Sequence, residues 1–153
     1  MLNQDYKEML QCLEKHNVKF LIVGAYAMAA HGFPRTTGDI DIWLKPCISN
    51  SISAFKAMAE FGAPLKDIDP SVFSYPGIIF QLGVAPCRID FITEISGDIK
   101  FDDAYSSSLT CEILGLSYRY INLKLLIKNK LATGRSKDLL DVQILSKMDT
   151  NND

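Results

Sequence analysis

Residues 20–44 read FLIVGAYAMAAHGFPRTTGDIDIWL and contain most of the information about the fold. The apolar run 18–23 predicts a buried strand, Gly24 ends it, and the alanine-rich segment 25–31 predicts a short helix. Residues 39–44 alternate acidic and apolar side chains, which is typical of a strand with one face in a core. A strand, a glycine turn, a helix and a second strand therefore follow one another within one short unit.

The rest of the chain predicts further helices and strands on both sides of this unit. Helices are expected over 3–16, 51–61, 123–133 and 136–148, and strands over 78–82, 88–93, 109–114 and 116–121. Asn122 is a suitable N-cap for the helix 123–133, and Gly134 ends that helix. The pattern predicts an α+β (α/β) fold, in which helices flank a mixed β-sheet and two helices close the chain.

The composition indicates one ordinary globular domain. The chain has 153 residues, 48% of them hydrophobic and 22% charged, which is enough for one sizeable core and is not typical of disorder. We expect a single domain over 1–148 and a disordered tail over 149–153. The formal net charge is −2, so no field of one sign calls for a long nucleic-acid duplex as partner.

The cysteines and the hydropathy pattern bear on the cellular compartment. The four cysteines, Cys12, Cys47, Cys87 and Cys111, form neither a Cys-x-x-Cys motif nor a Cys/His zinc pattern. Free thiols in a reducing compartment are the expected state. The sequence shows no basic and apolar leader and no apolar run near 18 residues, so we expect a cytoplasmic protein without membrane contact.

Asp39 and Asp41 form the first candidate site. Side chains of a strand alternate between its faces, so both carboxylates are expected on one face. Their repulsion is unfavourable unless a cation lies between them, and Mg²⁺ or Mn²⁺ prefers carboxylate oxygens. The alternative is an exposed edge strand with two solvated acids, and for an isolated Asp-x-Asp motif this alternative is the commoner one.

The residues before this acidic strand suggest a phosphate site. A helix that starts directly after Gly24 presents backbone N–H groups, including that of Ala25, and the positive end of its dipole. Arg35, Thr36 and Thr37 follow the helix and offer one guanidinium and two hydroxyls to phosphate oxygens. We therefore expect a phosphate binder and a metal binder within the same short unit.

This arrangement resembles the polymerase β-like nucleotidyltransferase superfamily. The family signature is an apolar residue, Gly, then Gly or Ser, a spacer, and an acid–apolar–acid triplet. Here Val23-Gly24-Ala25 is followed by thirteen intervening residues and then by Asp39-Ile40-Asp41-Ile42. Ala25 departs from the usual Gly or Ser, so only its backbone N–H is expected to contact a phosphate. The resemblance implies that Asp39 and Asp41 bind Mg²⁺ (or Mn²⁺) in a two-metal site for nucleotide transfer from an NTP.

The superfamily also uses a third carboxylate on a neighbouring strand. Asp90, within Arg88-Ile89-Asp90-Phe91-Ile92, has the alternation that this position requires. From this segment alone, a solvent-facing acid is an equally good interpretation. The resemblance implies that Asp90 is a metal ligand or the base that accepts the proton of the acceptor hydroxyl.

The two C-terminal helices carry a pair of charges on their apolar stripes. At about 100° per residue, the stripes consist of Leu123, Leu126, Ile127 and Leu131, and of Leu140, Ile144, Leu145 and Met148. Lys130 lies in the first stripe and Asp141 in the second, and a charge on a buried face needs a partner. Two compatible interpretations stay open: a Lys130–Asp141 ion pair, or a Lys130 that reaches the triphosphate while Asp141 or Asp138 holds it.

The segment 127–145, IKNKLATGRSKDLLDVQIL, is similar to the closing helices of AbiEii-type nucleotidyltransferases. This branch occurs in bacterial toxin–antitoxin and abortive-infection systems. Its basic and acidic positions match Lys130, Arg135, Lys137, Asp138 and Asp141. The resemblance implies that Lys130 neutralises charge in the transition state and that Asp138 belongs to the nucleotide site.

Together these features predict a Mg²⁺-dependent enzyme that transfers an NMP from an NTP to a hydroxyl group. The acceptor stays open between an RNA end such as that of tRNA, a protein and a small molecule, and a cognate partner chain is a further candidate. One alternative is a catalytically weak or inactive binding module of a toxin–antitoxin pair. Another is an antibiotic nucleotidyltransferase, ranked lower because the chain lacks a separate acceptor domain and the segment 46–84 is short for a drug pocket.

Overall fold

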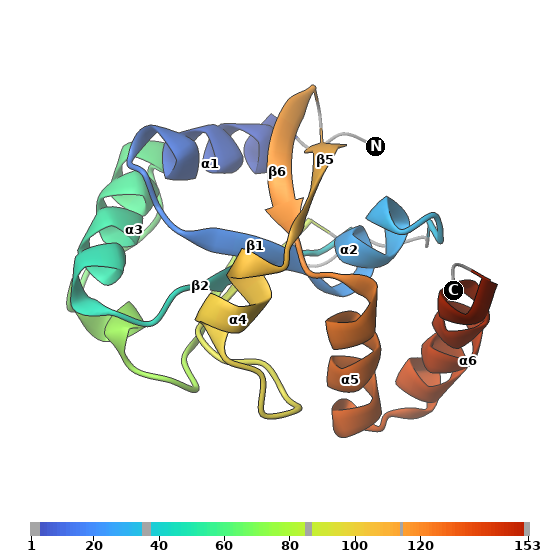
Figure 1. Ribbon diagram of the computed structural model, residues 1–153. Helices are drawn as coiled ribbons and strands as arrows, with labels where there is room; N and C mark the ends of the chain where they lie inside the picture. The colour runs from blue at the N-terminus through green and yellow to red at the C-terminus, as the bar shows by residue number, and fades with distance from the viewer. Residues whose placement is uncertain (1–3, 35–37, 85–86, 114, 152–153) are drawn as a thin grey trace.

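The computed structural model describes residues 4–34, 38–84, 87–113 and 115–151 (Figure 1). Its elements in chain order are α1 (Gln4–Lys15), β1 (Phe20–Val23), α2 (Gly24–Ala30), β2 (Ile40–Leu44), α3 (Ile48–Phe61), the 3₁₀ helix η1 (Val72–Ser74), β3 (Ile79–Leu82), β4 (Ile89–Ile92), α4 (Phe101–Ser106), β5 (Leu109–Ile113), β6 (Leu116–Tyr120), α5 (Leu123–Thr133) and α6 (Ser136–Asn151). Helices and strands mix along the chain as the sequence predicts, and the α+β fold class is confirmed.

All six strands belong to one mixed sheet in the order β3-β4-β2-β1-β6-β5. β1 is antiparallel to β2 and parallel to β6, while β2 is parallel to β4. The two outer hairpins, β3 with β4 and β5 with β6, are antiparallel. β2 therefore lies between β1 and β4, which brings the segments around residues 23, 41 and 90 together.

The core is formed by the central strands and by the helices that cover them. Every residue of β1 is buried, and α1 buries one stripe of residues at helical spacing: Tyr6, Met9, Leu10 and Leu13. Figure 1 shows α1 beside α3, and α5 beside α6 at the lower right. None of the described helices has the length and apolar content that a membrane crossing requires.

The boundaries of α5 follow from its capping residues, as predicted. The Asn122 side chain accepts a hydrogen bond of 2.8 Å from the backbone N–H of Leu125, which satisfies one of the free donors at the helix start. Gly134 ends α5 in the left-handed conformation with φ of 66°. α6 starts two residues later, at Ser136, so the two helices form a tight pair.

Two predictions about helix α6 need correction. Of the predicted stripe, Leu145 is buried, whereas Leu140 and Ile144 are 61% and 44% exposed. The buried face instead contains Asp138, Asp141 and Leu145. The apolar residues of α6 lie on several sides of the helix, so its packing against α5 selects the face that is buried. The helix also continues to Asn151, three residues beyond the expected end at 148.

Three other elements differ from the sequence prediction. α4 was not expected, because a helix of only six residues has too short an apolar pattern to be recognised. Its Phe101 ring packs edge-on against the buried Trp43 of β2, with ring centroids 5.1 Å apart. η1 lies between the predicted helix 51–61 and the predicted strand 78–82, where no helix was expected, and α3 starts at Ile48 rather than at residue 51.

Candidate functional site

A polar cavity of about 280 Å³ lies between the start of α2, the strands β2 and β4, and the helices α5 and α6. Its lining consists of Gly24, Ala25, Asp39, Asp41, Arg88, Asp90, Lys130, Arg135, Lys137, Asp138 and Asp141. The structure thus brings together the predicted residues Gly24, Ala25, Asp39, Asp41, Asp90, Lys130 and Asp138. The predicted phosphate ligands Arg35, Thr36 and Thr37 lie outside the described residues.

One side of the cavity is built by the strands, and we call Asp39, Asp41, Arg88 and Asp90 the strand wall. Asp41 pairs in register with Asp90 across the parallel strands β2 and β4. Paired residues of neighbouring strands point to the same face of a sheet, so both carboxylates line the cavity. Asp39 directly precedes β2 and joins them there.

Gly24 forms the floor beneath Asp41. Its φ of +69° lies in the left-handed region, and a Cβ built on it would lie 2.2 Å from Oδ2 of Asp41. Both the conformation and the close approach require glycine at this position. The glycine of the predicted motif therefore lets the turn from β1 to α2 pack directly against the carboxylate.

Arg88 lies among the carboxylates of the strand wall. Its Nε lies 2.7 Å from Oδ1 of Asp90, and its Nη2 lies 3.1 Å from Oδ2 of the same carboxylate. The same Nη2 is 3.2 Å from Oδ2 of Asp39, whose Oδ1 accepts a hydrogen bond from the Arg88 backbone N–H. Arg88 therefore bridges two of the three aspartates.

Sequence reasoning did not identify Arg88 as a site residue. The signal was available, because residues two apart in a strand share a face and Arg88 precedes Asp90 by two positions. A guanidinium on the face of a predicted metal ligand is a direct candidate for its counter-ion.

Asp41 is the least neutralised acid of this wall. Burial, followed by the charges of Asp90 and Asp39, raises the pKa of its carboxyl to about 6, although Arg88 and Lys130 act in the opposite direction. Among the described residues, no hydrogen bond or ion pair to the Asp41 carboxylate is found. The strand wall thus carries more negative charge than Arg88 balances.

Tyr6 supports the strand wall from α1. Its hydroxyl donates a hydrogen bond to the carbonyl of Gly38 and lies 3.2 Å from the carbonyl oxygen of Arg88. Burial raises the pKa of this phenol well above its usual range, followed by smaller effects of neighbouring groups, so the hydroxyl keeps its proton. The phenol thereby connects the backbone before β2 to the backbone before β4.

The opposite side is built by α5 and α6, and we call Lys130, Arg135, Asp138 and Asp141 the helix wall. Nζ of Lys130 lies 2.9 Å from Oδ2 of Asp141 and 3.8 Å from Oδ1 of Asp138. Arg135 makes a two-pronged contact with Asp138, with nitrogen–oxygen distances of 2.7 and 3.3 Å. The predicted ion pair between Lys130 and Asp141 is therefore present.

The carboxylates of the helix wall are buried and compensated. Burial acts to raise the pKa of Asp138, but hydrogen bonds from Arg135 and Thr133 and the charges of Arg135 and Lys130 outweigh it, so the pKa is lowered. Lys130 itself is only 8% exposed and still lines the cavity. The helix wall presents an ammonium group that is held in place by its own acids.

The donor atoms of the strand wall suit a hard divalent cation, but they are not yet arranged around one metal position. Within the described part of the chain, no three His, Cys, Asp or Glu side chains already converge on a common metal position. Two of the three carboxylates, those of Asp39 and Asp90, are instead in contact with the Arg88 guanidinium. The donor set is nevertheless all carboxylate oxygen with unbalanced negative charge, which suits Mg²⁺ or Mn²⁺.

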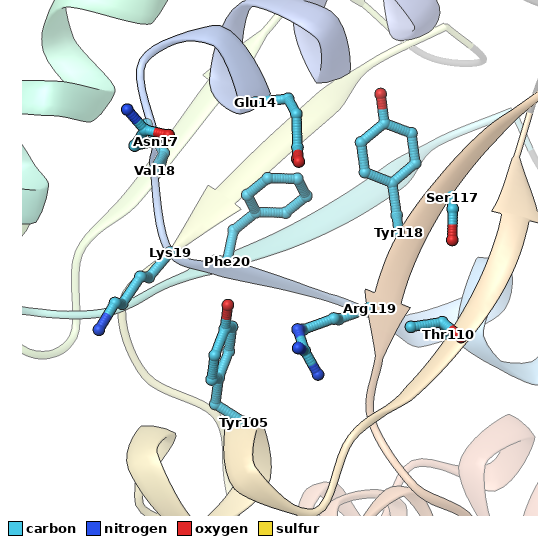
Figure 2. Close-up of a pocket in the computed structure, with 10 residues that line it drawn as sticks. All are labelled: Glu14, Asn17, Val18, Lys19, Phe20, Tyr105, Thr110, Ser117, Tyr118 and Arg119. Atoms are coloured by element: carbon cyan, nitrogen blue, oxygen red, sulfur yellow. The ribbon is translucent and has the colours of Figure 1, made fainter.

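A second hollow, of about 300 Å³, lies at the other end of β1 (Figure 2). Its lining includes the ring of Phe20 beside that of Tyr118, and Arg119 with its guanidinium 4.9 Å from the centre of the Tyr105 ring. None of the residues predicted to bind metal or nucleotide contributes to its lining, and Glu14 is its one carboxylate among the described residues. The cavity between the two walls is therefore the candidate site.

Neither a protein-family model nor a curated protein sequence matches the chain. Solved structures do match. A candidate nucleotidyltransferase from Thermotoga maritima, TM1012, is 14% identical with a TM-score of 0.64, and the match covers 97% of this chain and 96% of that one. The antibiotic-resistance factor ANT(2'')-Ia is also 14% identical with a TM-score of 0.64, covering 95% of this chain and 82% of its own.

A third solved structure is the lincosamide antibiotic adenylyltransferase LnuA with bound lincomycin. It is 10% identical to this chain with a TM-score of 0.59, and the match covers 95% of this chain and 97% of LnuA. At these identities the likeness concerns the fold. The six-stranded mixed sheet with flanking helices is thus the fold of solved nucleotidyltransferases.

Proposed function

We propose that this protein is a nucleotidyltransferase that transfers the NMP of an NTP to an acceptor hydroxyl. One observation carries the proposal: Asp39, Asp41 and Asp90 line a single cavity opposite a buried lysine. The fold of the matched structures supports it, because one is named an adenylyltransferase and another a candidate nucleotidyltransferase.

Asp39, Asp41 and Asp90 are the proposed ligands of Mg²⁺ or Mn²⁺. When bound, such cations neutralise the triphosphate and lower the pKa of the acceptor hydroxyl. The support lies in the donor chemistry and in the residual negative charge around Asp41.

The triphosphate is proposed to lie between the two walls. Gly24 and Ala25 belong to the first turn of α2, where backbone N–H groups lack partners within the helix. Lys130 faces them across the cavity, and an ammonium group has three protons. It can therefore keep its bond to Asp141 while it donates to a phosphate oxygen, and its fixed charge opposes the charge that develops in the transition state.

The test is transfer of label from α-labelled NTPs, with Mg²⁺, to the RNA and protein of a cell extract. We expect the double variant Asp39→Asn, Asp41→Asn to lose several orders of magnitude in transfer, because both carboxylates are proposed ligands. The matched control replaces Asp102 and Asp103, two exposed acids of α4, with Asn and should retain transfer. Undiminished labelling by the Asp39/Asp41 variant would refute the assignment.

One alternative acceptor class gains support from the comparisons. LnuA is an antibiotic adenylyltransferase, and this chain matches 97% of its length. A protein of this size is therefore large enough for an antibiotic acceptor. The short segment 46–84 is then no reason to rank this acceptor class lower. Transfer to an antibiotic panel that includes lincomycin, compared with transfer to extract RNA and protein, separates the two acceptor classes.

A non-catalytic binding module, such as one partner of a toxin–antitoxin pair, is the second alternative. It is favoured by Ala25 in place of Gly or Ser and by the lack of a preformed metal cluster among the described residues. Calorimetric titration with NTP decides between the hypotheses. An enzyme of the proposed kind should release or absorb heat in a Mg²⁺-dependent manner, and a pure interaction protein should not.

A further inference from the structure

Arg88 takes up the carboxylate oxygens that a cation would need. Its guanidinium contacts both oxygens of Asp90 and one of Asp39, at 2.7 to 3.2 Å. An oxygen that accepts a short bond from a guanidinium has one of its two lone-pair sites occupied and lies beside a fixed positive charge, which repels a metal ion. Arg88 and a divalent cation therefore compete for the same atoms.

The position of Arg88 allows its side chain to leave. Its side chain is 29% exposed, whereas that of Asp90 is 12% exposed. The residue directly precedes β4, and its neighbour Cys87 is exposed. Rotation of the long side chain toward solvent exposes the charged group to water and leaves β4 in place.

The helix wall offers a contrasting arginine. Arg135 makes the same two-pronged contact, with Nε 2.7 Å from Asp138, and its side chain is 63% exposed, so the exposure of the arginine does not distinguish the two pairs. The difference lies in the acid: Asp138 is 1% exposed and also lies 3.8 Å from Nζ of Lys130. A second cation therefore already shares that acid. Arg88 is the one cation that contacts acids of the strand wall among the described residues.

We infer that Arg88 is an exchangeable counter-ion: it holds Asp39 and Asp90 in the metal-free protein, and a divalent cation releases it. The inference rests on the proposed function for the nature of the cation. It adds that the metal site forms by exchange, so that the apparent metal affinity contains the cost of breaking the Arg88 pairs.

The first test measures binding of Mn²⁺ alone, without nucleotide, by calorimetry and by the electron paramagnetic resonance of the free ion. We expect Arg88→Gln to bind Mn²⁺ at least about tenfold more tightly than the wild-type protein, because the competing state is removed. Arg135→Gln, which breaks the equivalent contact on the helix wall, should leave the Mn²⁺ affinity within about twofold of wild type.

Unchanged or weaker Mn²⁺ binding by Arg88→Gln would overturn the inference, since Arg88 would then be a support of the site rather than a competitor. Such a result leaves the proposed function intact. Absence of Mn²⁺ binding in both proteins would overturn the inference together with the proposed metal site. Nucleotide transfer, measured separately, distinguishes these outcomes.

A second measurement uses the wild-type protein and does not depend on a folded variant. In ¹⁵N-labelled protein, the side-chain Nε–H signals of Arg88 and Arg135 should both be protected from exchange, since both groups donate to carboxylates. Added Mg²⁺ should shift the Arg88 signal and speed its exchange, and should leave that of Arg135 unchanged. The backbone amide signal of Asp41 shows when Mg²⁺ is saturating. An Arg88 Nε–H signal that stays protected from hydrogen exchange at that point would contradict the release of Arg88 by the cation.

Discussion

The two walls of the cavity use similar groups with opposite results. On the helix wall, Lys130 and Arg135 face Asp138 and Asp141, so cations and acids balance. On the strand wall, one guanidinium faces three carboxylates, and Asp41 is left with a raised pKa. The pKa of Asp138 on the helix wall is lowered, whereas that of Asp41 on the strand wall is raised.

This difference separates stability from function. A buried charge that has its partners contributes to the fold, and its removal harms the remaining partner. A cluster of like charges without sufficient partners destabilises the fold unless a ligand binds there. Substitution of a charged residue of the helix wall should therefore lower the free energy of unfolding. Neutralisation of an acid of the strand wall should raise it.

The largest loss of stability is expected for Lys130→Ala on the helix wall. The change removes the ammonium group from the buried Asp141 and Asp138, which should cost about 3–5 kcal/mol in free energy of unfolding. Urea denaturation measures this loss. Lys128→Ala, an exposed lysine of the same helix, should change stability by less than about 0.5 kcal/mol.

The same variant divides the two interpretations of Lys130. If Lys130 only joins the helices, the folded fraction keeps its NTP affinity, and if it also binds phosphate, that affinity falls. A stability loss under about 1 kcal/mol would contradict the compensated character of the helix wall.

Gly24→Ala should destabilise the strand wall by about 2–4 kcal/mol, since a left-handed alanine adds to a clash with Oδ2 of Asp41. Gly134→Ala is a matched control between α5 and α6. Its φ of +66° is close to the +69° of Gly24, but the nearest atom to its added Cβ would be 3.7 Å away. It should cost about 1–2 kcal/mol. Equal losses in the two variants would show that contact with Asp41 is unimportant.

Asp41→Asn should increase the free energy of unfolding by about 1–2 kcal/mol at pH 7 without metal. The folded-state pKa of about 6 lies above the usual 3.8, so the ionised carboxylate destabilises the fold. This destabilisation is absent below about pH 4 and grows as the pH rises through the folded-state pKa. Denaturation from pH 4 to 7 should therefore show the advantage of the variant appearing with increasing pH.

Asp138→Asn should behave in the opposite way, because the folded-state pKa of Asp138 is lowered. Its ionised form stabilises the protein above the unfolded-state pKa, and that stability is lost as the pH falls through the folded-state pKa. The variant should thus be less stable than wild type at pH 7 and approach it at acid pH. The same sign for both variants would remove the distinction between the walls.

The smallest effect is expected for Tyr6→Phe, which removes the hydroxyl that joins the backbone before β2 to that before β4. The loss should be about 1 kcal/mol, the usual net value of one hydrogen bond. Tyr118→Phe is the control: this tyrosine is also buried, and no hydrogen bond of its hydroxyl is found among the described residues. It should change stability by less than about 0.5 kcal/mol, so equal losses would argue against a role of Tyr6.

The sequence predicted the elements whose pattern is local. The spacing of Gly24, Asp39 and Asp41 placed a turn and an acidic strand correctly, because strand alternation and glycine turns depend on neighbours along the chain. The cavity that joins them to Asp90 and Lys130 also agrees with the expected arrangement, although the roles of these residues remain predictions.

Features that depend on tertiary packing were missed. The apolar residues of α6 are compatible with several buried faces. Its contact with α5 buries the face with Asp138 and Asp141 and leaves Leu140 exposed. The bridging role of Arg88 depends on Asp39, which reaches it from another strand segment. Such a contact across the sheet has no signature in the spacing of either segment.

Trp43, the one tryptophan of the sequence, makes the strand wall observable without any label. It lies on β2 two residues after Asp41, is 1% exposed and packs against Phe101. All indole emission of the protein therefore originates from the strand that bears the acids. A change in that emission on addition of Mn²⁺ or NTP would report on this strand alone, so one optical signal can follow both ligand binding and unfolding at the same place.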